Sequence, residues 1–111
     1  MPSFEFGDVV RAPFPYTDRD VRQHRPALVV AAGLGADRQM VWVLMITSAE
    51  NRRWPDDVEV VDHAASGLPV PSLIRTAKIA TVEAGRIEKV GAVTAAVAEA
   101  VRRALIGRLS E

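Results

Sequence analysis

Apolar residues fall in short blocks along most of this chain, and glycine, proline or polar residues separate the blocks. Blocks of this length that are rich in valine, isoleucine and aromatic residues are typical of β-strands. We expect strands at residues 6–13, 26–32, 39–46 and 58–61, and a further strand or bent pair of strands at residues 72–83. Most of the chain is therefore predicted to be antiparallel β-structure.

The segments between these blocks predict turns and one long loop. Gly33 and Gly35 begin like the glycine fingerprint of a dinucleotide-binding fold, but a second apolar block follows where that fold needs a helix, so we predict a hairpin turn. Residues 13–24 form a loop of about a dozen residues, and loops of this length in compact domains are usually functional or mobile. Residues 49–57 form a polar excursion with room for one helical turn before Pro55.

Only the last part of the chain has a helical period. Thr94 is suited to the N-cap, and arginines near the end complement the helix dipole. Apolar residues recur there at helical spacing, at Val97, Ala100, Val101, Ala104 and Leu105. About five antiparallel strands followed by one amphipathic helix predict a mainly β fold with α: a small, half-open barrel with the helix packed against it.

Length and composition narrow the class of protein. A chain of 111 residues is expected to be a single domain, residues 1–111, with a core of its own. The absence of cysteine excludes disulfides, Cys-based zinc sites and thiol chemistry. No apolar run approaches the roughly 20 residues that span a bilayer, and no signal peptide is recognisable, so we expect a cytoplasmic protein without membrane contact.

The charge balance changes what kind of ligand contact is expected. Lys+Arg and Asp+Glu number 14 each, so the chain does not have the excess positive charge of a typical nucleic-acid-binding domain. Lys78 and Lys89 are the only lysines, and the planar fork of arginine suits bidentate phosphate contacts. Any anionic ligand must therefore meet a local patch of arginines, although a preference for arginine codons explains the composition equally well.

Five segments in a fixed order carry a family resemblance: "PFPYTD", "RPALVV", "MITS", "GLPVPSLIR" and "RIEKVG", the last of them just before the final helix. In this order and spacing, from Gly7 to the helix, the chain resembles the PemK/MazF family of toxins from type II toxin–antitoxin systems. The resemblance implies an SH3-like antiparallel barrel, a homodimer and a sequence-specific, metal-independent endoribonuclease that cleaves single-stranded messenger RNA by 2′-hydroxyl attack. It also implies a cognate antitoxin, DNA binding only through the antitoxin complex, and no cofactor.

The same resemblance implies the catalytic residues. Arg25, in the "RP" step, and Thr47, at the end of the third strand, match the family's catalytic pair. Arginine can hold two phosphate oxygens and stays charged at physiological pH, so Arg25 suits stabilisation of the phosphorane. A threonine hydroxyl is not a base at neutral pH, so Thr47 is expected to hydrogen-bond the phosphate, with Ser48 assisting if its side chain faces the same way.

The general base is harder to assign. Histidine exchanges protons most readily near neutral pH, which makes His24 the natural candidate. Adjacent strand residues alternate faces, however, so His24 is equally able to point away from Arg25 and to contact phosphate elsewhere. Asp18 and Asp20 in the long loop are weaker candidates.

Further residues are expected to contact RNA. Trp54 follows Arg52 and Arg53 directly and is suited either to stacking on a base or to packing at a dimer or barrel edge. Arg75 is either an RNA or dimer contact or simply an exposed arginine near a strand start. The predicted RNA-binding residues are Asp18, Arg22, Ser48, Arg52, Arg53, Trp54, Ser72 and Arg75.

His63 and the Asp56-Asp57 pair most simply belong to surface turns, and no metal site is predicted. The alternative function is a toxin of the same fold that binds a protein instead of cutting RNA, in the manner of the gyrase poisons. That alternative requires C-terminal residues including tryptophan, whereas this sequence ends "GRLSE".

Overall fold

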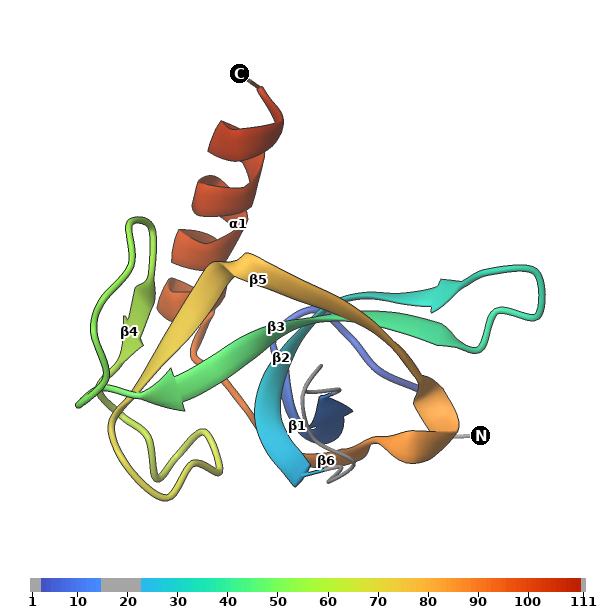
Figure 1. Ribbon diagram of the computed structural model, residues 1–111, viewed down its shortest axis with the longest axis horizontal. Helices are drawn as coiled ribbons and strands as arrows, with labels where there is room; N and C mark the ends of the chain where they lie inside the picture. The colour runs from blue at the N-terminus through green and yellow to red at the C-terminus, as the bar shows by residue number, and fades with distance from the viewer. Residues whose placement is uncertain (1–2, 15–22, 111) are drawn as a thin grey trace.

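The computed structural model describes residues 3–14 and 23–110, which form one six-stranded antiparallel sheet and a C-terminal helix (Figure 1). The mainly β fold with a final helix is thus confirmed. The strands are β1 (Asp8–Phe14), β2 (Gln23–Leu34), β3 (Met40–Ser48), β4 (Val58–Val60), β5 (Ser72–Glu83) and β6 (Glu88–Ala92). The helix α1 covers Ala95–Leu109, and a short 3-10 helix, η1, covers Ala84–Arg86.

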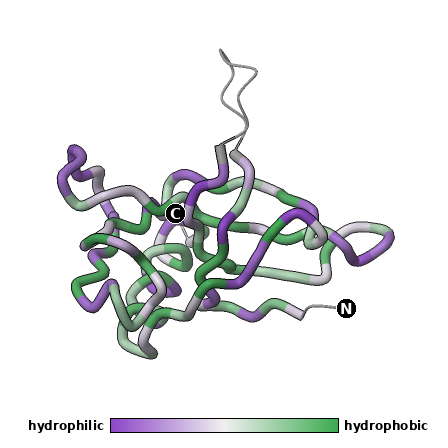
Figure 2. Tube along the Cα trace, turned by 90° about the horizontal axis from the view of Figure 1, so that it is seen from below, coloured by the Kyte–Doolittle hydropathy of each residue, from purple (hydrophilic) through white to green (hydrophobic). Residues whose placement is uncertain are grey.

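The strand order in the sheet is β4-β5-β3-β2-β1-β6, so the first and last strands of the sequence are neighbours. Asp8 pairs with Ala92 and Arg11 with Glu88. The sheet curves strongly, so that β1, β2 and β6 wrap around an interior while α1 covers the sheet beside β4 and β5 (Figure 1). Figure 2 shows hydrophilic residues at the tips of projecting loops and hydrophobic stretches between them.

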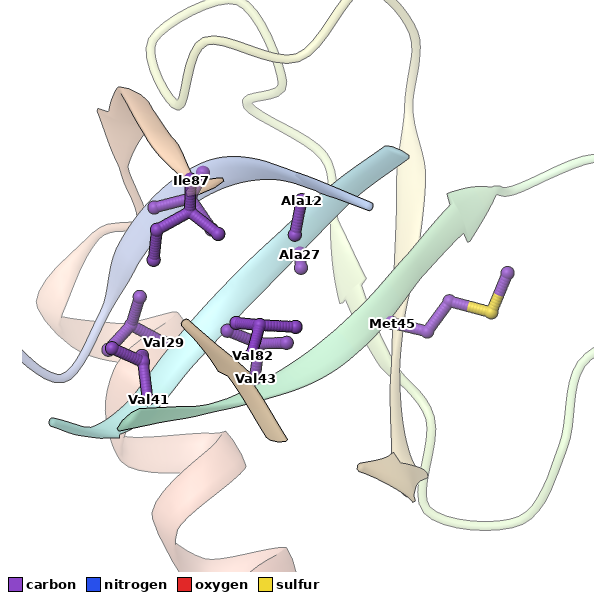
Figure 3. Packing of buried hydrophobic residues seen from close by; sticks show 9 residues of the cluster. Ala12, Ala27, Val29, Val41, Val43, Met45, Val82 and Ile87 are labelled. Atoms are coloured by element: carbon purple, nitrogen blue, oxygen red, sulfur yellow. The ribbon is translucent and has the colours of Figure 1, made fainter. Parts of the chain in front are cut away.

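Both faces of the curved sheet are buried, in two separate clusters. The inner cluster, inside the curve, consists of Val10, Ala12, Ala27, Val29, Val41, Val43, Met45, Val82 and Ile87 (Figure 3). The helix-side cluster consists of Val9, Leu28, Leu44, Ile46, Val60, Leu68, Ile74 and Val101. Alternate residues of one strand enter different clusters because side chains alternate across a strand. Burial on both faces explains the continuous apolar runs of β2 and β3.

Strand β2 begins three residues before the predicted start at Pro26. His24 and Arg25 belong to the strand and pair with Pro13 and Ala12 of β1. Proline cannot donate a ladder hydrogen bond, but the ladder between β2 and β3 begins only at Ala27, so Pro26 leaves no gap in it. The prediction of a loop up to residue 24 was therefore wrong at its C-terminal end.

The other predicted strand boundaries agree with the structure to within two residues, and two further predictions differ from it. Strand β6 was not predicted, because its five residues, "EKVGA", show no apolar alternation and it pairs with β1 at the sheet edge. The helical turn before Pro55 does not form, and residues 49–57 contain turns only. The ambiguous segment 72–83 is one bent strand: Leu44 pairs with Ile79 but Met45 pairs with Arg75, which leaves three extra residues in β5 at the bend.

Helix α1 is capped as predicted. The Thr94 hydroxyl accepts a hydrogen bond from the Val97 N–H, at 3.3 Å. Val101 is fully buried against the sheet, whereas Ala100 is exposed although it was predicted on the apolar face. Near the helix end, Arg108 Nη2 lies 3.0 Å from Asp56 Oδ2, which ties the helix to the loop before β4. None of the helices in the described ranges is both long and apolar enough to cross a membrane.

A glycine contact joins the loop between β4 and β5 to strand β6. A Cβ atom on Gly67 would collide with the Val90 carbonyl oxygen, and one on Gly91 with the Ser66 carbonyl oxygen. Gly67 also has a φ of +80°, which favours glycine. The two backbones can approach this closely only because neither residue has a side chain.

Candidate functional site

The predicted catalytic residues lie at the open end of the inner cluster. The ladder between β2 and β3 pairs Val29 with Val43 and ends at the pair of Ala27 with Met45; Arg25 and Thr47 each lie two residues beyond this last pair, on β2 and β3. Alternate residues share a face, so Arg25 and Thr47 project on the side of the inner cluster, just beyond Ala27 and Met45. Both residues are half-buried. In Figure 3, Met45 lies near the arrowhead of β3 and marks this end of the cluster.

The Thr47 hydroxyl is held by a neighbour that the sequence did not reveal. Asn51 Nδ2 donates a hydrogen bond to Thr47 Oγ1 at 2.6 Å, and the Asn51 N–H donates to the Ser48 carbonyl at 3.0 Å. The backbone bond closes the turn after β3 and so places the amide beside the hydroxyl. Because Oγ1 accepts from Asn51, the hydroxyl proton of Thr47 is left to be donated to a ligand.

His24 and Ser48 face the other side of the sheet. His24 is exposed and lines a groove of about 480 Å³ together with Arg11, Pro26 and the loop at Leu68. Ser48 Oγ accepts a hydrogen bond from the Glu50 N–H at 3.3 Å. The structure therefore does not bring these two side chains to the face shared by Arg25 and Thr47. Each is the direct strand neighbour of a residue on that face, and adjacent residues of a strand point to opposite faces.

A second feature of the same face is the Arg75 cluster, which we define as Arg75, Asp57, Trp54 and the backbone of Arg52. Arg75 lies across from Met45 in the ladder and is only 6% exposed. Its Nη1 lies 3.2 Å from Asp57 Oδ2, and its Nη2 donates to the Arg52 carbonyl at 2.8 Å. Of the alternatives for Arg75, a simply exposed arginine is ruled out, because the guanidinium binds a buried carboxylate 18 residues away.

Trp54 covers the guanidinium of Arg75. The guanidinium carbon is 4.1 Å from the centroid of the indole ring, within cation–π range. The Trp54 N–H donates to Asp57 Oδ2 at 2.8 Å, so the same carboxylate oxygen holds both residues. Trp54 nevertheless remains 40% exposed. The ring is thus fixed against the protein on one side and open to solvent on the other.

The other predicted RNA contacts occupy varied positions. Arg52 and Arg53 are exposed, and Arg53 lies 3.8 Å from Glu59. Ser72 is buried and its hydroxyl donates to the Val70 carbonyl at 2.7 Å. Asp18, Asp20 and Arg22 lie outside the residues that the structure describes.

Within residues 3–14 and 23–110, no group of three or more histidine and carboxylate side chains is placed to hold a metal ion. His63 lies on the surface with Nδ1 3.4 Å from the Val61 carbonyl. The side chains that this face offers to a ligand are a guanidinium, a hydroxyl and an aromatic ring.

Comparison with known proteins identifies a family for nearly the whole chain. The model described as "PemK-like, MazF-like toxin of type II toxin-antitoxin system" matches residues 5–108. No curated protein sequence matches at a significant level.

Solved structures agree with that match at the level of the fold. The Mycobacterium tuberculosis toxin MazF-mt6 is 21% identical, with a TM-score of 0.69 over 93% of this chain and 96% of that one. MazF from Deinococcus radiodurans is 20% identical, with a TM-score of 0.69 and 96% of each chain covered. An endoribonuclease from a mycobacterial species, solved in complex with its cognate antitoxin, is 20% identical, with a TM-score of 0.71 over 97% of this chain and 96% of that one.

Proposed function

Because this chain belongs to the PemK-like, MazF-like toxin family of type II toxin–antitoxin systems, we propose that it is a metal-independent endoribonuclease that cleaves single-stranded RNA at short sequence motifs. The observation that carries the proposal is that Arg25 and Thr47, both half-buried, follow the last pair of the β2–β3 ladder and project on the side of the inner cluster. A permanent cation and a hydroxyl donor on one face are suited to one phosphate group.

In the proposed reaction the 2′-hydroxyl of one nucleotide attacks the adjacent phosphorus, and the bond from phosphorus to the 5′-oxygen breaks. The products are a 2′,3′-cyclic phosphate and a 5′-hydroxyl, and the proton lost by the 2′-oxygen is balanced by the one gained at the 5′-oxygen. Arg25 stabilises the charge that builds up on the phosphorane, and Thr47 donates to a non-bridging oxygen. The base is left unassigned, because His24 faces away from this pair.

The proposed partners follow from the family. Deinococcus radiodurans MazF has been solved with MazE, and the mycobacterial endoribonuclease with its cognate antitoxin. We propose that this chain is likewise silenced by a cognate antitoxin that covers the face of Arg25 and Thr47. We also propose that it works as a homodimer.

The proposal is tested with purified protein and single-stranded RNA in the presence of EDTA. The wild type should give discrete cuts that end in a cyclic phosphate, and Arg25→Ala should lower the rate by about 10²-fold or more. Arg25→Lys keeps the charge but loses the planar fork, so it should recover only part of the rate. Circular dichroism checks that both variants fold.

Two results would contradict the mechanism: a requirement for a divalent metal, or full activity of Arg25→Ala. Induction in cells distinguishes the alternative function. DNA damage without cleavage of messenger RNA would indicate a toxin that acts by binding a protein.

A further inference from the structure

We propose that Trp54 is a stacking platform for one unpaired RNA base beside the scissile phosphate, and that Arg75 is the positioning residue that holds its ring. The inference rests on the proposed ribonuclease function and specifies how the substrate is held. It assigns to the Arg75 cluster the recognition of a base rather than of a phosphate.

The platform is built from three anchors. Asp57 Oδ2 accepts from the Trp54 N–H and holds Arg75 at 3.2 Å, and Arg75 in turn binds the Arg52 carbonyl. The Trp54 backbone and the underside of its ring are therefore tied to the same buried ion pair. A tryptophan fixed in this way loses little conformational freedom when a base stacks on it, which favours binding.

The burial of the ion pair is informative about its role. Arg75 and Asp57 have side chains that are 8% and 1% exposed, and burying two charges costs desolvation energy that their attraction often only offsets. In other proteins, well-packed apolar residues of similar volume often replace a buried ion pair without loss of stability. What the guanidinium adds is a flat cationic surface that sets the plane of the indole ring above it.

The platform lies next to the catalytic pair. Arg75 pairs with Met45, and Thr47 lies two residues further along β3, a step of about 7 Å in a strand. The loop that carries Trp54 follows β3 directly, and its residue Asn51 donates a hydrogen bond to Thr47. This segment lies between β3 and β4 in Figure 1. A phosphate held by Arg25 and Thr47 would thus place a neighbouring base within reach of the ring.

Stacking on an aromatic side chain is how proteins commonly hold single-stranded nucleic acid. Arg52 and Arg53 directly precede Trp54 and are exposed, so they are available to meet the backbone of the same nucleotide. Removing one stacking aromatic residue typically weakens binding roughly 5- to 100-fold. The platform should tolerate several bases, because every base has a flat face.

The experiment uses an RNA oligonucleotide that contains the wild-type cleavage motif, read beforehand from cleavage ends, with a 2′-deoxy nucleotide at the cut site. A series of such oligonucleotides carries a single abasic nucleotide at successive positions. Dissociation constants are measured by fluorescence anisotropy for the wild type, Trp54→Ala, Trp54→Phe and Arg75→Lys. Trp42→Ala serves as the matched control, because Trp42 is also exposed, at 45%, but sits out of step with Thr47 on β3.

We expect Trp54→Ala to raise the dissociation constant roughly 5- to 100-fold, Trp54→Phe to raise it less, and Trp42→Ala to leave it unchanged. Arg75→Lys keeps a charge for Asp57 but removes the flat surface, so it should weaken binding while the protein remains folded. One abasic position next to the cut site should weaken binding to the wild type but not to Trp54→Ala. That coupling is what a merely structural role of Arg75 and Trp54 would not produce.

The inference is overturned if Trp54→Ala binds like the wild type, or if no abasic position shows the coupling. It is also overturned if light scattering shows that Trp54→Ala changes the mass of the protein in solution instead of its RNA affinity, since the ring would then contact a second copy. If the wild type cuts RNA and Trp54→Ala binds and cuts it equally well, only the platform fails. If the wild type cuts no RNA, the proposed function fails.

Discussion

At the scale of single residues, the state of the Thr47 hydroxyl decides what it can offer a substrate. An asparagine amide that donates to Oγ1 leaves the hydroxyl proton pointing elsewhere, so Thr47 can act as a donor to phosphate. Asn51 thereby acts through Thr47, as a positioning residue that does not itself need to touch RNA.

Replacing Asn51 tests whether the direction of its hydrogen bond to Thr47 matters for catalysis. Asn51→Ala removes one hydrogen bond, so we expect kcat to fall by up to about tenfold. Asn51→Asp has the same shape but can only accept, so the Thr47 proton turns toward the carboxylate, and kcat should fall further. Steady-state cleavage of a fluorogenic RNA substrate measures both variants.

Gln39→Glu makes the same amide-to-carboxylate change just before the other end of β3 and should leave kcat unchanged. An unaltered kcat in Asn51→Asp would show that Thr47 is not oriented by this amide.

The residues of the face differ in how far sequence reasoning could reach them. Arg25 and Thr47 were identified from the order of motifs, and the strands place both on the side of the inner cluster. For Arg75 the sequence left an RNA or dimer contact and a simply exposed arginine as alternatives. Its partner Asp57 is 18 residues away and comes close only once β5 and the loop before β4 are folded. Asn51 gave no signal, because a lone asparagine in a polar turn is unremarkable.

At the scale of elements, the backbone of the loop between β4 and β5 crosses strand β6 at a close contact that two glycines allow. The loop between β4 and β5 meets β6 at Gly67 and Gly91, and this contact also forms part of the wall of the groove at His24. Strand β6 escaped prediction because edge strands can be short and polar, so their sequences lack the apolar alternation on which strand prediction depends.

Gly91→Ala should therefore destabilise the fold. The added methyl group meets the Ser66 carbonyl, and forced contacts of this kind typically cost about 1–3 kcal/mol. Gly107→Ala is the matched control: nothing lies within 4 Å of a Cβ there, and alanine in a helix interior should stabilise by about 0.5–1 kcal/mol. Urea denaturation of both variants gives the free energies of unfolding. Equal changes of the same sign in the two variants would show that the close contact does not require glycine at position 91.

At the scale of the whole molecule, positive and negative charges balance, so the local distribution of arginines decides where RNA is attracted. A net charge of zero gives little long-range attraction for RNA, so binding should rest on a few arginines near the catalytic face. Arg52 and Arg53 lie in the loop that carries Trp54, whereas Arg102 and Arg103 lie on α1 and pair with Glu99.

The salt dependence of RNA binding distinguishes these two pairs. Each phosphate contact to a single strand contributes about 0.7 to the slope of log affinity against log salt concentration. The double variant Arg52→Gln/Arg53→Gln should therefore lower the slope by about 1.4 if both residues contact phosphate. Arg102→Gln/Arg103→Gln removes the same charge and should leave the slope unchanged. Equal slopes in both double variants would mean that overall charge, and not the loop, attracts RNA.

The pairing of β1 with β6 also has a consequence for the newly made chain. While the protein is being synthesised, the outer edge of β1 has no partner until residues 88–92 have left the ribosome. Contacts between such distant segments form late, and unpaired strand edges invite wrong partners. The strand that flanks Arg25 is thus completed only when nearly the whole chain is available. The face that carries Arg25 is therefore expected to remain unfinished on the ribosome until residues 88–92 are free to pair with β1.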